Sequence, residues 1–389
     1  MIDDPSIEPF GAGPYATAQR WLHLGQPGDP AVRRRMIVAA TVALGPLLVL
    51  AAADGVLLGP TPKESLLCDF GTLGRYLIAL PVLLVAEYSY LPRLAQVVRY
   101  MPDSGIIGPD EQPRYAALVV SARNLVASRV VAFVLVVLAY GLTLGVGLVA
   151  YSPSESTWVA PITAAGHHIS AAGWWRILIS QPLFLIVVGT LFWRMIVWTV
   201  FLRKLSRFNL RLLASHPDRR GGLGFIPASV RAFPPLGVAI GTIAASTVAG
   251  LVKFEGHPVV EVEYAALAAV LAVTSLLTVP LLVFGPVLFK LRTDGIYKYG
   301  RLMHDVGQSF EARWLPPARP KADPVGAPDF SSMIDLSTVV TNVYAITPIM
   351  VDLPSLTPLV ISTLVPFIPV LFIILPAQQI VGAVAKFLL

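Results

Sequence analysis

The sequence predicts an all-α membrane protein that crosses the bilayer about seven times, with its N-terminus in the cytoplasm. The chain has 389 residues, of which 55% are hydrophobic and only 13% are charged, and its mean hydropathy is +0.71. Because a soluble domain carries about 25% charged residues, this composition excludes a disordered chain and nearly excludes a water-soluble globule. Several apolar runs also reach the ~20 residues that span a bilayer.

Apolar runs separated by polar segments define the seven spans. We expect them at residues 36–59, 72–91, 130–151, 177–202, 234–252, 265–289 and 355–376. The second and fifth runs are short or interrupted by proline, at Pro81 and Pro234, which a membrane helix tolerates where neighbouring groups satisfy the freed carbonyl. Further prolines predict kinks in span six, at Pro280, and in span seven, at Pro366.

The distribution of Lys and Arg predicts the orientation. With the N-terminus inside, the cytoplasmic segments hold 23 Lys and Arg residues, whereas the outside loops hold four. Cytoplasmic loops of membrane proteins carry such an excess of Lys and Arg. Membrane topology therefore explains why 29 basic residues outnumber 23 acidic ones better than nucleic-acid binding does. The single cysteine, Cys68, excludes an intramolecular disulfide and a cysteine-based metal site.

The spans divide the chain into four expected parts. These are a polar cytoplasmic segment (1–35), a bundle of six spans (36–290) with basic cytoplasmic loops 92–125 and 203–233, a cytoplasmic helical segment (291–354), and a final span with a tail (355–389). Apolar residues at helical spacing up to Trp314 predict that span six continues into the cytosol, and a second amphipathic helix is expected to begin near Ser332, with Asp335 as a capping signal. We find no internal repeat, which argues against an inverted-repeat transporter.

Apart from Arg75, which is counted with the outside loop at the start of span two, three ionisable residues fall inside the expected spans: Asp54, Glu87 and Arg194. A charge at that depth costs several kcal/mol unless it is paired or hydrated, so such residues are candidates for a permeation or coupling role. A purely structural ion pair between Glu87 and Arg194 is the alternative. Asp54 lies near the outer end of span one, where water can reach it, and the pattern favours an interfacial carboxylate without a further role.

The most distinctive local motif is HPDRRGGLGF at 216–225, in the most basic cytoplasmic loop. Its candidate ligand-binding residues are His216, Asp218, Arg219, Arg220, Gly221, Gly222 and Gly224. Glycines permit a backbone in which successive N–H groups converge, and flanking arginines add charge, so the loop is predicted to gate the protein or to bind a phosphate or another small anion. It is not a Walker loop, and a structural turn is the alternative.

Metal and cofactor signals are weak. His167 and His168 adjoin the Trp174–Trp175 pair of an expected membrane interface, and His304 lies on the cytoplasmic extension of span six, where it could approach His216 and Asp218. We predict no cofactor and no metal site. Packing signals are clearer, because small residues recur at every fourth position of span five, at Gly237, Gly241, Ala245 and Ala249.

Three segments together resemble a known family. They are the RYLIALPVLLVAE run at 75–87, the AGWW sequence at 172–175 and the HPDRRGGLGF loop, and the 364–371 tail is also similar. This combination resembles an uncharacterised family of bacterial multi-pass inner-membrane proteins with an AGWW…HPDxxGGLGF signature. The resemblance implies a location in a bacterial inner membrane and places Glu87, His216, Asp218 and 221–224 at motif positions. It implies no activity.

The residues favour one class of function over two others. We expect an ion channel or transporter, oligomeric in the bilayer, with the charged intramembrane residues on its path. The alternative is a non-transporting scaffold or sensor that binds a partner, an anionic lipid or a nucleotide at its basic cytoplasmic face. An enzyme using His216, Asp218 and His304 is the least supported class, and no nucleic-acid partner is expected.

Overall fold

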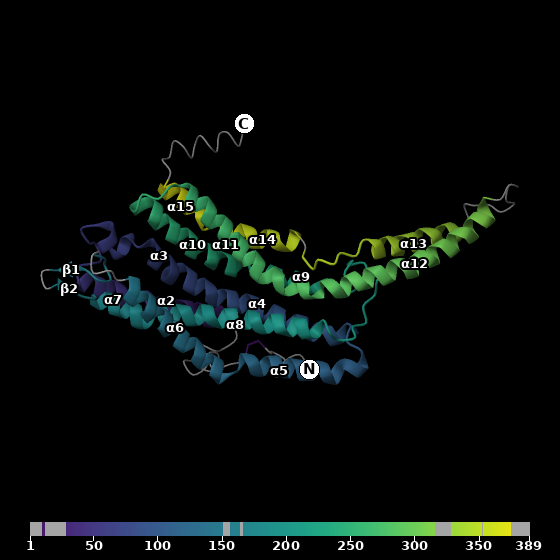
Figure 1. The fold of residues 1–389 in the computed structure, drawn as a ribbon, viewed down its shortest axis with the longest axis horizontal. Coiled ribbons are helices and arrows are strands. Elements are labelled where there is room, and N and C mark those ends of the chain that lie inside the picture. Colours follow the sequence, from purple (N-terminus) through teal and green to yellow (C-terminus); the bar gives the residue numbers. More distant parts are fainter. Residues whose placement is uncertain are drawn as a thin grey trace, which may run out of the picture.

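The computed structural model describes residues 10–11, 29–150, 156–163, 166–315, 328–351 and 353–374, which form an elongated bundle of long helices (Figure 1). Seven helices in this part of the chain are long and apolar enough to cross a membrane. The protein is therefore an all-α polytopic membrane protein, as the sequence predicts. The described extended structure comprises one antiparallel pair, β1 (Ile162–Thr163) with β2 (Gly166–His167), and an isolated bridge between Ile107 and Leu210.

Each expected span corresponds to one long helix or to two or three consecutive helical segments. In chain order the longer elements are α2 (Asp29–Ala53), α3 (Phe70–Leu73), η4 (Gly74–Ala79), α4 (Leu80–Asp103), α5 (Gln112–Val126), α6 (Arg129–Ala150), α7 (Ala171–Trp175), η6 (Arg176–Ser180), α8 (Gln181–Leu205), α9 (Phe225–Ala228), α10 (Pro234–Phe254), α11 (Val260–Thr278), η8 (Val279–Phe284), α12 (Gly285–Trp314), α13 (Pro328–Tyr344), α14 (Leu353–Leu364) and α15 (Phe367–Ile374). Short 3₁₀ turns fill several links: η2 (Pro62–Glu64), η3 (Leu66–Cys68), η5 (Pro109–Glu111) and η7 (Ser229–Ala232).

The predicted basic loop 92–125 is mostly helical. Helix α4 continues through Pro92 to Asp103, and α5 then returns over most of the remainder. The expected span thus continues as a helix beyond residue 91, and Pro92 lies within that helix. The expected kinks are confirmed: Pro280 lies in the 3₁₀ segment η8, and residues 365–366 form a turn between α14 and α15.

The bundle has two chemically different ends. We call the end with the 206–224 loop the inner end, because the charge pattern predicts that it faces the cytoplasm, and the end with the 54–69 loop the outer end.

Helix α10 packs against α14 through Gly237 and Gly241. A Cβ atom on Gly241 would lie 2.1 Å from the carbonyl oxygen of Thr363, so the two backbones are in direct contact. The small-residue pattern of span five thus serves helix packing within the chain.

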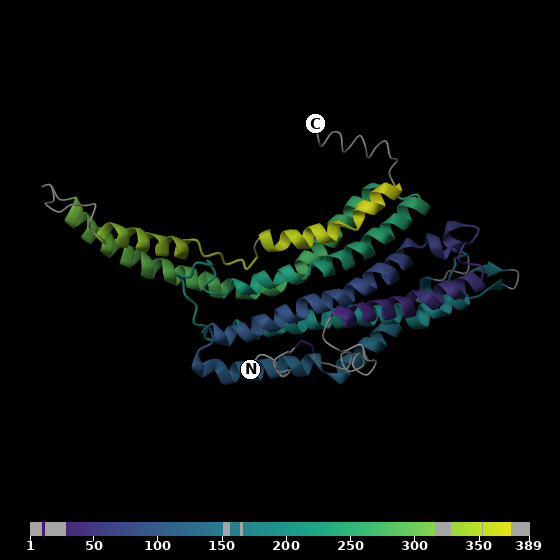
Figure 2. The same cartoon turned by 180° about the vertical axis from the view of Figure 1, so that it is seen from behind.

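Helices α12 and α13 form an arm that extends beyond the inner end of the bundle (Figures 1 and 2). At the base of the arm, Val343 and Ile346 are fully buried beside Ala214 of the 206–224 loop, and Gly295 leaves room for this contact. The continuation of span six to Trp314 is confirmed. The second helix begins at Pro328 rather than near Ser332, and Asp329 rather than Asp335 lies in its first turn, where it accepts hydrogen bonds from the end of α12.

Candidate functional site

Glu87 and Arg194 form an ion pair inside the bundle. Nη1 of Arg194, on α8, donates to Oε1 of Glu87, on α4. The Arg194 side chain is 3% exposed and that of Glu87 13% exposed, so neither charge is hydrated as it would be at the surface. The geometry brings together two of the three ionisable residues predicted from the sequence, and the Coulomb attraction between them offsets part of the cost of burial.

Aromatic and polar groups surround this pair. The hydroxyl of the fully buried Tyr90 lies beside the Arg194 guanidinium, and the Tyr90 ring stacks on Phe233 with a centroid distance of 5.0 Å. One residue before Tyr90, the hydroxyl of Ser89 donates to the carbonyl oxygen of Ala232 at 2.8 Å. The ion pair therefore lies where α4, α8 and the entry to α10 meet. Any change in the pair alters the packing environment of all three segments.

Asp54 lies apart from this pair. It directly follows α2 at the outer end and is exposed, and its Oδ2 accepts a hydrogen bond of 3.1 Å from the backbone N–H of Ala172, in the first turn of α7. A carboxylate at a helix N-terminus satisfies an otherwise unpaired donor and interacts favourably with the helix dipole. Its observed contact is a link between α2 and α7.

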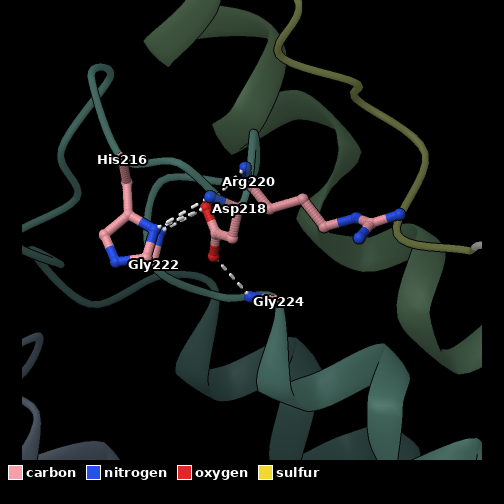
Figure 3. A network of polar contacts seen from close by, with 5 residues as sticks. All are labelled: His216, Asp218, Arg220, Gly222 and Gly224. Atoms are coloured by element: carbon pink, nitrogen blue, oxygen red, sulfur yellow. Dashed lines mark hydrogen bonds and ion pairs between the residues drawn. The ribbon is translucent and has the colours of Figure 1, made fainter. Parts of the chain in front are cut away.

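The 216–225 loop folds around the carboxylate of Asp218 (Figure 3). The Oδ1 atom accepts hydrogen bonds from the amide groups of Arg220, at 2.8 Å, and Gly222, at 3.1 Å. The Oδ2 atom accepts one from the amide of Gly224 at 2.8 Å, and Nδ1 of His216 lies 2.8 Å from Oδ1. The predicted nest of backbone donors exists, and it already holds an anion supplied by the chain itself.

This geometry explains the composition of the loop. Positive φ values occur at Arg219, Gly221 and Gly222, of +55°, +67° and +98°, and they turn the amide groups inward. Burial opposes ionisation of the Asp218 carboxyl, but the three amide donors and the His216 ring together hold its pKa below the ordinary value. Three of the amides expected to bind an external anion are therefore engaged internally, and the Arg220 side chain extends away from them (Figure 3).

The loop is also joined to the base of the arm. The amide of Thr347, after α13, donates to the carbonyl oxygen of Arg219 at 3.2 Å. A Cβ atom on Gly221 would lie 2.6 Å from Cδ2 of Leu291 on α12. The loop and the base of the arm are thus in direct contact, through one backbone hydrogen bond and through the packing of Leu291 against Gly221.

The histidine candidates do not assemble into a site. Across the ranges that the structure describes, no three His, Cys, Asp or Glu residues lie close enough to hold a metal ion. His304 is exposed on α12 and His168 is exposed before α7, and the side chain of His167 lies outside the described part. The approach of His304 to the 216–225 loop, which a catalytic cluster would need, is not seen in the structure.

Sequence reasoning missed a short internal repeat. The pattern R-x-L-I-(A/S)-x-P occurs at 75–81 and again at 176–182. In both copies the residues before the proline form a π-helical segment, in which the amide of Leu80 donates to Arg75 and that of Gln181 donates to Arg176, five residues back. A proline has no N–H and its ring clashes with the carbonyl four residues earlier, so a wider turn before it relieves the clash.

The three helices that run from the outer to the inner end also share the spacing from a proline to a later arginine. Pro81 to Arg93, Pro182 to Arg194 and Pro280 to Arg292 each span twelve positions, in the three helices that run from the outer to the inner end. Both copies of the pattern run from the outer to the inner end, so they do not form an inverted repeat. The pattern around Arg75 and Arg176 is visible in the sequence, although both arginines also count among the four basic residues of the outside loops.

No family model, no curated protein and no solved structure matches this chain. The geometry of the described residues is therefore the basis for the functional conclusions below.

Proposed function

We propose that this multi-pass membrane protein is a transporter whose path is opened and closed at the Glu87–Arg194 ion pair. One observation carries the proposal: two opposite charges, from α4 and α8, are paired inside an apolar bundle. Charges at membrane depth are expensive and are typical of ion and substrate paths. We place the protein in the inner membrane of a bacterium, as the resemblance implies.

The low exposure of the pair favours a transporter over an open channel. A charged side chain that lines a continuous water-filled pore is hydrated, whereas Arg194 is only 3% exposed. Transport then requires the pair to separate, and the contact of the neighbouring Tyr90 with Phe233 couples that separation to α10. In a bistable protein such a contact shifts the populations of two states.

Flux through the purified protein tests the proposal. Full-length wild type, Glu87→Gln and the control Glu263→Gln, an exposed carboxylate at the start of α11, are reconstituted in liposomes with a potassium chloride gradient. We expect flux in the wild type and the control and a change of about tenfold or more in Glu87→Gln, because one charged partner contributes about 1.4 kcal/mol or more. Equal flux in all three proteins contradicts the proposal.

A second function, that of a scaffold, is favoured by the arm. Helices α12 and α13 extend beyond the inner end (Figure 2), and Tyr297, Leu302 and Ile334 on them are 76%, 46% and 65% exposed. Near the tip, Asp329 pairs with Arg313 at 2.8 Å and Phe310 contacts Phe330, so the two helices are held together along their length. Exposed apolar side chains on a polar helical surface are typical of sites for protein partners.

Cross-linking in cells distinguishes the two functions. A photoreactive residue at position 297 is expected to give a discrete adduct with a cytosolic protein, and Ile334→Glu is expected to abolish this adduct without changing flux. The matched control places the photoreactive residue at 289, which is 61% exposed but lies where α12 leaves the bundle. Identical adducts at both positions, or none at 297, contradict the scaffold.

A further inference from the structure

A cavity of about 400 Å³ lies at the outer end of the bundle, where α3, η4, η6 and α10 meet the segment that precedes α7. Three cationic side chains line it: Lys63, Arg75 and Arg176. The two arginines belong to the two copies of the R-x-L-I-(A/S)-x-P repeat, and both lie in its π-helical segments. The repeat thus contributes two guanidinium groups, one from each copy, to a single cavity.

The acidic side chains of the cavity leave an excess of one positive charge. Asp69 and Glu255 also line the wall. The carboxylate of Asp69 accepts hydrogen bonds from the amide and the hydroxyl of Thr72, at 2.8 and 2.6 Å, and from the indole N–H of Trp158 at 3.1 Å. It therefore caps α3 and fixes the position of the Trp158 ring, while Glu255 is exposed beyond the end of α10.

The arrangement orients the two guanidinium groups. The Arg176 guanidinium carbon lies 5.3 Å from the centre of the Trp158 ring, a cation–π distance. Nη2 of Arg75 reaches back along its helix, and a Cβ atom built on Gly71 would be 3.4 Å from it. Arg75 and Arg176 are both cationic and line the same cavity, so their charges repel each other. An anion placed between them converts this repulsion into two attractive, charge-assisted contacts.

We propose that this cavity binds a phosphate ester, with Arg75 and Arg176 contacting the phosphate oxygens. The planar fork of a guanidinium matches phosphate bidentately, and a tetrahedral phosphate presents oxygens to two forks from different directions. Phe70, Phe254 and Trp158 line the rest of the cavity, which provides an apolar wall for the group attached to the phosphate. The cavity lies at the ends of the spans, so the ester is carried either by a phospholipid headgroup or by a soluble molecule.

Direct binding to the detergent-solubilised full-length protein tests the site. The probes are sn-glycerol 3-phosphate and mixed micelles of phosphatidylglycerol, with phosphatidylcholine micelles as the zwitterionic reference. The variants are Arg75→Gln, Arg176→Gln and Arg176→Lys, which keeps the charge but loses the fork. Lys253→Gln is the matched control, because it removes one exposed positive charge at the same end of α10 but does not line the cavity.

We expect at least one probe to bind wild type and Lys253→Gln equally, and to bind each Gln variant about tenfold or more weakly, the size of one lost charge-assisted hydrogen bond. The lysine variant is expected to lie between them. Binding of phosphatidylglycerol alone identifies a lipid headgroup, and binding of glycerol 3-phosphate identifies a soluble ester. Absence of binding by both probes, or equal binding by wild type and a folded Arg176→Gln, overturns the proposal.

This site does not depend on the proposed transport function. Binding is measured without flux, and the substitutions lie at the opposite end of the outer-to-inner helices from the arm and the 216–225 loop. Where Arg75→Gln fails to fold, the two Arg176 variants still decide the outcome. If the Arg75 and Arg176 variants lose phosphate binding but keep their flux, the outer cavity is independent of transport. If Glu87→Gln loses flux but binds phosphate normally, transport is independent of the outer cavity.

Discussion

Arg194 of α8 pairs with Glu87 of α4, across 107 residues of sequence, and the side chain of Arg194 is almost fully buried. Because removal of one partner leaves an uncompensated buried charge, we expect Glu87→Gln to lower the free energy of unfolding by about 3–5 kcal/mol. Denaturant unfolding of the solubilised protein measures this change. Glu111→Gln, which loses an ion pair with the exposed side chain of Arg114, is the control and should change stability by less than about 1 kcal/mol. Equal effects of both substitutions would argue against a buried pair.

The Asp218 carboxylate is expected to hold the 216–225 loop together. In Asp218→Asn the side-chain oxygen can replace one acceptor, but the amide nitrogen then faces a backbone N–H, so at least one of the three donors loses its partner. The expected loss is about 1–3 kcal/mol of local stability, the usual cost of an unsatisfied buried donor. Hydrogen exchange at Arg220, Gly222 and Gly224 measures it. Unchanged protection of all three amides would show that Asp218 does not organise the loop.

The lowered pKa of Asp218 predicts a pH dependence with a defined sign. A carboxyl group whose pKa is lower in the folded state stabilises that state above its unfolded pKa of about 4, and this contribution is lost as the pH falls through the folded value. The stability difference between wild type and Asp218→Asn is therefore expected to be constant near neutral pH and to shrink below pH ~4. A difference that grows on acidification would contradict the sign. Thermal unfolding of both proteins across this range provides the measurement.

The contact between α10 and α14 makes a glycine substitution informative. In Gly241→Ala the new methyl group would overlap the backbone of Thr363, which cannot move away as a flexible side chain does, so the helices must separate. We expect a loss of about 1–3 kcal/mol in unfolding free energy. Gly250→Ala on the same helix is the matched control, since no atom lies within 4 Å of its new Cβ, and it should be neutral or stabilising by up to about 1 kcal/mol. A larger loss of stability in Gly250→Ala than in Gly241→Ala would mean that α10 and α14 are not in contact at Gly241.

The sequence predicts the existence of the spans better than their ends. Hydropathy alone locates seven helices, because an apolar run of ~20 residues has few alternatives to crossing the bilayer. It does not predict that α4 continues to Asp103, because hydropathy locates the apolar run and not a helix that continues beyond it. The π-helical segments before Pro81 and Pro182 depend on the local clash of a proline ring, which an average over 20 residues does not detect.

The candidate sites were predictable to different degrees. The sequence identifies Glu87 and Arg194 as expensive groups, but their pairing depends on how α4 and α8 pack, which no local pattern encodes. In the 216–225 loop the glycines correctly predict converging amides. The sequence-based prediction of an external anion missed that the chain supplies the anion itself. Asp218 lies two, four and six residues before Arg220, Gly222 and Gly224, whose backbone N–H groups donate to it. That spacing identifies the Asp218 carboxylate as the anion that these N–H groups bind.

A charge-reversal cycle tests the central claim, that the Glu87–Arg194 pair controls transport, most directly. Wild type, Glu87→Arg, Arg194→Glu and the double variant are compared for both unfolding free energy and ion flux in liposomes. We expect the double variant to recover most of the stability lost in each single variant, because the opposite charges are restored, while its flux or ion preference stays different from wild type. Recovery of stability together with the wild-type flux and ion preference would show that the pair is a structural contact only, and would contradict the account.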